Sequence, residues 1–176
     1  MSYCLQCGHK TKKEIPTDDT KLRQVCPQCG YIHYENPKVI CGALVIWQEK
    51  VLLCKRAIEP RYGYWTLPAG YMELGETMAQ GAQRETLEEA EAVVNLEQLY
   101  CLYDVPHIGQ IYSVFKGTLE NGKFGAGIET LESRLFSEDE IPWDELAFPS
   151  VKSTLQHYFN DRKTLSFPLH LQTIEQ

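Results

Sequence analysis

The sequence has no apolar run long enough to cross a membrane. The longest such run, residues 39–47, is far shorter than the ~20 residues that a transmembrane helix needs. The first residues, Met1 to Cys4, also lack the apolar core of a secretory signal peptide. These absences predict a soluble, cytoplasmic protein with no membrane partner.

Positive charge is scarce as well. Lys and Arg number 17 against 24 Asp and Glu, which gives a net charge of −7. This acidic excess repels anionic lipid and the phosphate backbone of nucleic acids, so neither is an expected partner. An acidic protein that binds a phosphorylated substrate needs local positive charge from bound cations or a few placed arginines.

Seven cysteines are present, and their odd number argues against a complete set of disulfides. Four of them form two glycine-closed units, Cys4-Leu5-Gln6-Cys7-Gly8 and Cys26-Pro27-Gln28-Cys29-Gly30. The spacing indicates a four-cysteine zinc site, in which each glycine permits the positive φ of the turn. A redox dithiol is the alternative, but one copy would suffice for it. Four thiolates leave no open coordination position, so the predicted zinc is structural. The other three, Cys41, Cys54 and Cys101, lie in apolar runs and are expected in the core.

Composition divides the chain into a zinc ribbon at residues 1–35 and a larger domain at residues 36–176. Hairpin strands are expected in the ribbon at residues 11–15 and 21–25. In the larger domain, strands are expected at residues 39–47, 51–54, 64–68, 96–105, 108–119 and 131–136, with an edge strand within 164–171 and helices at 77–93 and 149–161. Strands mixed with two helices, without regular alternation, predict an α+β sandwich.

The first of these helices carries a cluster of acidic residues. Thr77 is its expected N-cap, and Gln80 completes a capping box. Glu85, Glu88 and Glu89 lie three and four residues apart, so they share one flank of the helix. Their charges oppose the dipole at the helix C-terminus. Mg²⁺ or Mn²⁺ would offset them, because carboxylate oxygens are preferred ligands of these ions. A solvated acidic face is the alternative that the helix alone leaves open.

The residues before the helix extend this pattern. Gly70 is followed after five residues by Glu76 and, after seven more, by Arg84-Glu85-x-x-Glu88-Glu89. This arrangement resembles the Nudix box, and Trp65-Thr66-Leu67-Pro68-Ala69 is similar to the usual lead-in of that family.

Two positions depart from the family pattern. Thr86 stands where an aliphatic residue is usual, and Glu91 stands where a glycine is usual. We expect Thr86 to face the core and to bond a carbonyl one turn back. We expect Glu91 to remove the left-handed C-cap that a glycine would supply.

The resemblance implies a Nudix α/β/α sandwich with a mixed sheet and a metal-dependent hydrolase site. Glu85 and Glu89 would hold divalent cations, with Glu88 and the Gly70 carbonyl assisting. Glu76 and Arg84 would orient these groups. The cations would neutralise a diphosphate and lower the pKa of an attacking water.

Family members often take a general base from a later loop. Here Gly125 and Gly127 mark a loop that leads to Glu129 and Glu132. We expect Glu129 to be the base or a further ligand, and Glu132 is the second candidate. Two surface glutamates are the alternative.

A zinc ribbon before a Nudix domain resembles the NADH pyrophosphatases and the ADP-ribose/FAD pyrophosphatases. The Ser-Gln-Pro-Trp array of the NADH enzymes is absent from residues 102–110, and Pro106 stands where ADP-ribose hydrolases often have a proline. The expected substrates are therefore ADP-ribose, FAD and NADH, in that order. Candidate contacts to the nucleotide are Arg56 and Arg61 for phosphate, and Tyr103, Tyr62, Tyr64 and Phe148 for an aromatic ring.

Two other classes of protein compete with this interpretation. One is a regulator whose zinc ribbon contacts nucleic acid and whose Nudix domain only senses a ligand, but the box here keeps every acidic residue. The other is a nucleoside triphosphate hydrolase, which usually lacks a zinc ribbon. Homodimers are common among similar proteins, although no segment of this sequence marks an interface.

Overall fold

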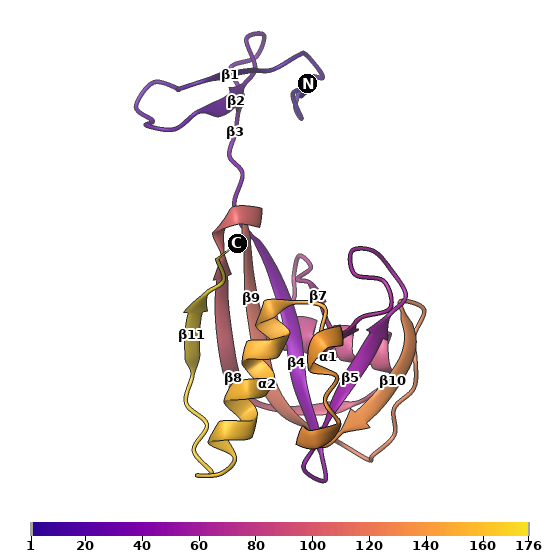
Figure 1. Ribbon diagram of the computed structural model, residues 1–176. Coiled ribbons are helices and arrows are strands. Elements are labelled where there is room, and N and C mark those ends of the chain that lie inside the picture. Colours follow the sequence, from indigo (N-terminus) through magenta and orange to yellow (C-terminus); the bar gives the residue numbers. More distant parts are fainter. Residues whose placement is uncertain (1, 176) are drawn as a thin grey trace. The chain divides into compact units, whose positions relative to one another are not determined.

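The computed structural model of the protein describes residues 2–175. The chain divides into two compact units, Met1–Asn36 and Pro37–Gln176. The first unit is a three-stranded antiparallel sheet of β1 (Lys12–Glu14), β2 (Arg23–Val25) and β3 (Ile32–His33) (Figure 1). The predicted hairpin is confirmed, and β3 adds a strand that was too short to predict.

Both cysteine turns of the first unit close as expected. Gly8 and Gly30 have φ angles of 71° and 73°, in the left-handed region that glycine adopts readily. Their amides donate to the carbonyls of Cys4 and Cys26, each over 2.9 Å. The two turns therefore have the same backbone geometry.

The second unit combines one large sheet with two helices (Figure 1). Its elements are β4 (Lys38–Trp47), β5 (Lys50–Arg56), β6 (Trp65–Thr66), β7 (Ala69–Tyr71), α1 (Met78–Ala90), β8 (Val94–Val105), η1 (Pro106–Ile108), β9 (Gln110–Leu119), β10 (Thr130–Phe136), η2 (Glu138–Glu140), η3 (Trp143–Glu145), α2 (Pro149–Asp161) and β11 (His170–Thr173). The two predicted helices and most predicted strands are confirmed, although β9 begins later than expected because η1 precedes it. Within residues 2–175, neither helix is long and apolar enough to cross a membrane.

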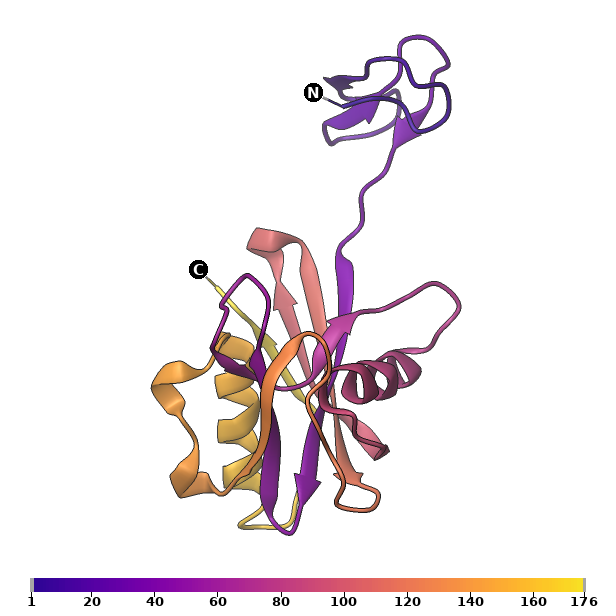
Figure 2. The same ribbon diagram turned by 90° about the vertical axis from the view of Figure 1, so that its right-hand side faces the viewer.

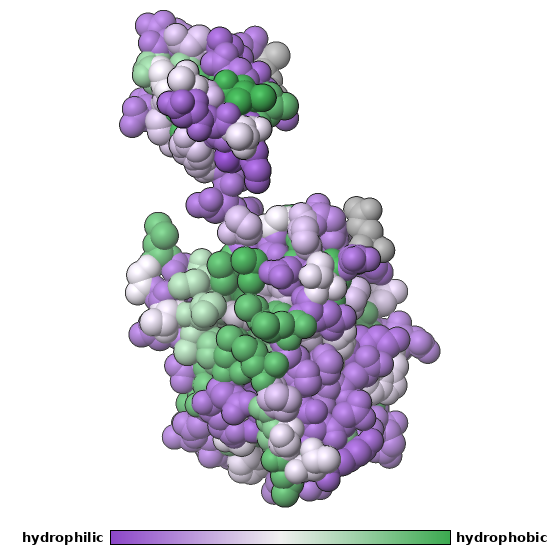
Figure 3. Space-filling view, turned by 90° about the vertical axis from the view of Figure 1, so that its left-hand side faces the viewer, coloured by the Kyte–Doolittle hydropathy of each residue, from purple (hydrophilic) through white to green (hydrophobic). Residues whose placement is uncertain are grey.

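The large sheet is mixed. Its strand order is β10-β5-β4-β9-β8-β11, and β6 and β7 pair with β5 and β4. β4 is parallel to β9 and β11 is parallel to β8, whereas the other pairs are antiparallel. The C-terminal segment forms an edge strand, as Pro168 predicts. Figure 3 shows hydrophobic side chains gathered on the face at which β11 lies, where Leu169 and Leu171 are exposed.

Alternating side chains of the central strands pack against the two helices. In β4, Ala43 and Val45 belong to the cluster that includes Ala90 of α1, whereas Leu44 belongs to the cluster that includes Leu155 of α2. β5 alternates in the same way. Because successive residues of a strand point to opposite faces, the sheet separates two apolar layers. Figure 2 shows α1 and α2 on opposite faces of the sheet, which confirms the α/β/α sandwich.

The structure of α1 shows how both departures from the family pattern are accommodated. Thr77 and Gln80 form the predicted capping box, and the buried Thr86 hydroxyl donates to the Ala82 carbonyl over 2.7 Å. The prediction for Glu91 was wrong. Glu91 keeps the left-handed C-cap, with φ 49° and ψ 31°, and its amide donates to the Leu87 carbonyl. The cap therefore forms without a glycine.

This backbone conformation should cost stability. A residue with a side chain loses about 1–2 kcal/mol of stability when it adopts the left-handed conformation. Glycine avoids this cost, but its greater freedom in the unfolded chain lowers stability by ~0.4–1 kcal/mol. We expect Glu91→Gly to raise the free energy of unfolding by about 0.5–1 kcal/mol in urea. Glu91→Ala is the control, because it removes the carboxylate but keeps Cβ. Equal stabilisation by both substitutions would contradict the backbone explanation.

Candidate active site

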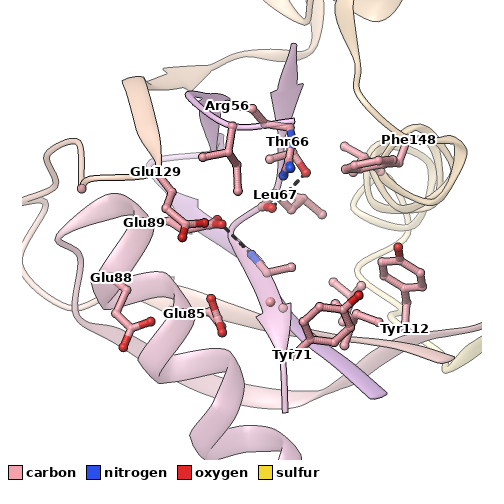
Figure 4. A pocket seen from close by; sticks show the side chains of 18 of the residues that line it. Arg56, Thr66, Leu67, Tyr71, Glu85, Glu88, Glu89, Tyr112, Glu129 and Phe148 are labelled. Carbon is pink, nitrogen blue, oxygen red and sulfur yellow. Dashed lines mark hydrogen bonds between the residues drawn. The ribbon is translucent and has the colours of Figure 1, made fainter. Parts of the chain in front are cut away.

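A pocket of ≈ 1330 Å³ opens beside α1 in the second unit. Its lining includes residues of α1, β7, β9, the end of β5, the loop before β10 and the start of α2. Figure 4 shows carboxylates on one side of the pocket and Tyr71, Tyr112 and Phe148 on the other. The pocket therefore has an acidic wall and an aromatic wall.

The acidic wall consists of Glu85, Glu88 and Glu89 from α1 and Glu129 from the loop before β10. Glu89 is only 8% exposed, and its Oε2 accepts the Ala69 amide over 3.1 Å. Burial raises the pKa of the Glu89 carboxyl to about 8 and also raises the pKa of Glu85. Both carboxylates therefore lack sufficient positive charge or hydrogen bonding to offset their burial.

The backbone of β7 lies directly against this wall. A Cβ atom at Gly70 would overlap the Glu85 carboxylate, so a larger residue at this position would displace that carboxylate. The carboxylate oxygens of Glu85 and Glu89 thus gather beside the backbone of Ala69 and Gly70 and form a cradle. Such hard oxygen donors fit Mg²⁺ or Mn²⁺ and would not favour a soft metal ion.

Arg84 connects the carboxylates of α1 to the loop before the helix. Its guanidinium donates to both carboxylate oxygens of Glu76, over 3.1 and 2.8 Å, and to the Tyr71 carbonyl over 3.0 Å. It also donates to Glu85 over 2.6 Å and to Glu88 over 3.2 Å. The hydrogen bond from Arg84 lowers the pKa of Glu76. Arg84, which also lines the pocket, is therefore fixed by Glu76 and holds Glu85 and Glu88 in place.

Two residues of the aromatic wall, Tyr71 and Tyr112, and the neighbouring Gln110 were not predicted from the sequence. Tyr71 of β7 and Tyr112 of β9 both pair with Ile40, on opposite sides of β4. This register brings the two tyrosines to the same region of the sheet, where Gln110 bridges them. The Tyr112 hydroxyl donates to Gln110 Oε1 over 2.9 Å, and Gln110 Nε2 donates to the Tyr71 hydroxyl over 3.2 Å. No local pattern in the sequence could reveal this pairing.

Phe148 and Arg56 lie together in the lining of the pocket. The Arg56 guanidinium carbon lies 5.3 Å from the centre of the Phe148 ring, and Arg56 Nε donates to the Pro60 carbonyl over 2.9 Å. This cation–π contact holds the two predicted nucleotide contacts side by side.

Several other predicted residues lie elsewhere. The prediction for Tyr103 was wrong, because its side chain is fully buried and its hydroxyl pairs with Thr154 Oγ1 over 2.9 Å. Glu132 is exposed on β10 and does not line this pocket. Arg61 also lies outside that lining, and its guanidinium carbon is 5.6 Å from the Tyr64 ring centre. Glu129 is therefore the loop glutamate that the fold brings to the carboxylates of α1.

The cysteines of the first unit form a separate cluster. The sulfur atoms of Cys4, Cys7, Cys26 and Cys29 all lie within 4.8 Å of one another. Cys4 and Cys29 are 3.6 Å apart, and Cys7 and Cys26 are 3.5 Å apart. A tetrahedral site with Zn–S bonds of about 2.3 Å has sulfur atoms roughly 3.8 Å apart. The cluster therefore has the size and the ligands of a four-thiolate zinc site.

Comparisons with known proteins agree with this geometry. A crystal structure of a NUDIX hydrolase from Nitrosomonas europaea matches with a TM-score of 0.97 and 50% identity over 100% of both chains. NAD-capped RNA hydrolase NudC of Haemophilus influenzae is 39% identical over an alignment of 92 residues that covers 49% of this chain but only 32% of that protein. ADP-ribose pyrophosphatase of Methanocaldococcus jannaschii is 31% identical over 126 residues, 69% of this chain and 73% of that protein.

Two protein-family models match most of the chain. The zinc-ribbon family described as Nudix N-terminal matches residues 2–35, and the NUDIX domain family matches residues 37–157. The second match includes the acidic helix, the Gly70 cradle and the loop that carries Glu129. The chain therefore belongs to the Nudix hydrolase family, with a zinc-ribbon segment before its NUDIX domain.

Proposed function

We propose that the protein hydrolyses the diphosphate bond of a nucleoside diphosphate derivative, with ADP-ribose preferred over FAD and NADH. The observation that carries this proposal is the convergence of Glu85, Glu88, Glu89 and Glu129 in one pocket. Buried carboxylates with raised pKa values suit divalent cations, and a diphosphate supplies the remaining negative charge.

In this proposal, Glu85 and Glu89 hold Mg²⁺ or Mn²⁺, with Glu88 and the Gly70 carbonyl as further donors. Bound cations supply charge neutralisation of the diphosphate and a lower pKa for a bound water. Arg84 holds the Glu85 and Glu88 carboxylates in position through its hydrogen bonds to them.

Glu129 acts as the general base. It takes one proton from a water molecule, whose oxygen forms a new bond to phosphorus. The bond between that phosphorus and the bridging oxygen breaks, and the bridging oxygen leaves with the other phosphate. Each product therefore carries one phosphate group.

The aromatic wall gives the pocket a second function, which is recognition of the organic part of the substrate. Phe148 offers a flat apolar surface, and the Tyr71–Gln110–Tyr112 network offers hydroxyl and amide groups beside it. An aromatic ring can stack on a base, and hydroxyl and amide groups beside it can hydrogen-bond the edge of that base. The relative from Methanocaldococcus jannaschii is an ADP-ribose pyrophosphatase, which agrees with a nucleotide of this class.

A substrate panel tests the proposal. Purified protein is incubated with Mg²⁺ or Mn²⁺ and with ADP-ribose, FAD, NADH, diadenosine polyphosphates or dNTPs, and the products are identified by mass spectrometry. We expect AMP and ribose 5-phosphate from ADP-ribose, with the highest kcat/KM of the panel. A strong preference for dNTPs would overturn the substrate class.

Phe148→Ala tests the aromatic wall. Stacking of one base on an aromatic side chain contributes about 1–3 kcal/mol, so we expect KM for ADP-ribose to rise roughly 10-fold, with kcat within about 2-fold of wild type. Tyr62→Ala is the control, because Tyr62 is 55% exposed and lies outside the described pocket lining. An unchanged KM in Phe148→Ala would exclude this ring from substrate binding.

The cysteine cluster has a different role in this proposal. Cys4, Cys7, Cys26 and Cys29 hold one Zn²⁺ ion with no open position for a substrate. The zinc is therefore structural, and the hydrolytic cations belong to the pocket of the second unit.

A further inference from the structure

The loop before β10 meets the C-terminal end of α1 backbone to backbone. The Gly125 amide donates to the Ala90 carbonyl over 2.7 Å, and the Gly127 amide donates to the Glu89 carbonyl over 3.0 Å. These carbonyls belong to the last turn of the helix, where no intrahelical partner is available. The loop therefore caps the same helix that carries the metal-binding carboxylates of the proposed function.

Gly127 makes the closest of these approaches. A Cβ atom at this position would overlap the carbonyl oxygen of Glu88. Gly127 is not among the residues with positive φ, so an alanine could adopt its backbone conformation. The obstacle is space alone, and it is a backbone atom of α1 that no side-chain rotation can remove.

The chain just after Gly127 is fixed from two further sides. The Thr130 amide donates to the Gly127 carbonyl over 3.1 Å, and the Ala57 amide donates to the Glu129 carbonyl over 2.8 Å. Glu129 is thus held between the end of α1 and the chain that follows β5. Its side chain lies beside those of Glu85 and Glu89 in the pocket (Figure 4).

We propose that Gly127 is a positioning residue that sets the place of Glu129 relative to the carboxylates of α1. Close packing of the loop on the helix end joins the base and the metal-binding groups into one rigid unit. This inference rests on the proposed function, because it takes Glu129 as the general base. It assigns a role to a residue without a side chain, which acts through the place of its backbone against α1.

Gly125 provides a matched control within the same loop. A Cβ atom there would overlap the carboxylate end of Glu91, which is a flexible side chain. Glu91 can rotate away, whereas the Glu88 carbonyl cannot. Gly125→Ala and Gly127→Ala therefore make the same chemical change against a movable and an immovable neighbour.

The experiment compares steady-state kinetics on ADP-ribose with Mg²⁺ for these two variants, Glu129→Gln and the double variant Gly127→Ala/Glu129→Gln. A displacement of a catalytic group by about 1 Å lowers the rate roughly 100-fold. We therefore expect kcat of Gly127→Ala to fall roughly 100-fold, while its KM stays within about 3-fold of the wild-type value. Gly125→Ala should stay within about 3-fold of wild type in kcat. The double variant should be no slower than Glu129→Gln, because residues that act as a unit are not additive.

Amide hydrogen exchange of residues 122–130 gives a second readout that needs no turnover. Exchange should be faster in Gly127→Ala and unchanged in Glu129→Gln. Near-normal kcat in Gly127→Ala would overturn the proposal, as would a further loss of kcat when Gly127→Ala is added to Glu129→Gln. If the wild-type protein hydrolysed no member of the substrate panel, the proposed function would fail, and unchanged exchange in Gly127→Ala would then separately overturn the positioning role.

Discussion

Glu85→Gln should lower kcat for ADP-ribose hydrolysis by about 1,000-fold, since cations at such sites contribute several kcal/mol to stabilising the transition state. Glutamine keeps the size of the side chain and can still accept the hydrogen bond from Arg84. It removes the negative charge that the proposed function assigns to cation binding. Glu85 lies against Gly70 and Arg84. The substitution therefore changes the charge at this position and leaves its packing nearly the same.

Two further measurements separate loss of chemistry from loss of fold. Thermal unfolding of Glu85→Gln should occur close to the wild-type temperature, and Mn²⁺ binding followed by electron paramagnetic resonance should weaken by at least about 10-fold. Glu120→Gln is the matched control, because Glu120 is exposed after β9 and outside the described pocket lining. Near-normal kcat in Glu85→Gln would refute the metal role of this side chain.

Removal of zinc should unfold residues 2–35 and leave the NUDIX domain folded. Among the described residues of the first unit, the buried apolar set contains only Cys4, Val25 and Cys26. A unit below about 40 residues with so small a core needs a metal or disulfides to fold. Zinc binding by four thiolates supplies about 10–16 kcal/mol in comparable small units, so nearly all the stability of the ribbon should come from the metal.

Elemental analysis and two-dimensional NMR test this expectation. Freshly purified protein should contain about one zinc per chain, and Cys26→Ser or a strong chelator should collapse only the ribbon signals. Cys101→Ala is the control, because Cys101 is buried in the core of the second unit and its variant should keep its zinc. A dispersed ribbon spectrum after complete removal of zinc would contradict a metal-dependent fold.

Local sequence patterns predicted the helices well. The capping box of α1 and the amphipathic run of α2 are encoded within a few consecutive residues, and both helices form where expected. The short strands β3 and β7 were not predicted, because two or three residues carry too little periodicity to be recognised.

The parts of the site that were missed or wrong depend on contacts between distant segments. Tyr71 and Tyr112 come together only because both pair with Ile40, and strand register is not visible in either segment alone. Tyr103 was wrongly placed in the site because its burial depends on which face of β8 meets α2. Glu91 shows the converse case, since the surrounding loop and helix impose a left-handed conformation that its own sequence preference disfavours.

Hydrolysis of ADP-ribose in ¹⁸O-labelled water tests the central claim most directly. The protein is incubated with Mg²⁺ and ADP-ribose, and the products are analysed by mass spectrometry. We predict equal amounts of AMP and ribose 5-phosphate, with one ¹⁸O atom on the phosphate group of one of them and none on the ribose or adenine. Label outside the phosphate groups, or no hydrolysis of ADP-ribose, FAD or NADH with either Mg²⁺ or Mn²⁺, would contradict water attack on phosphorus in this pocket.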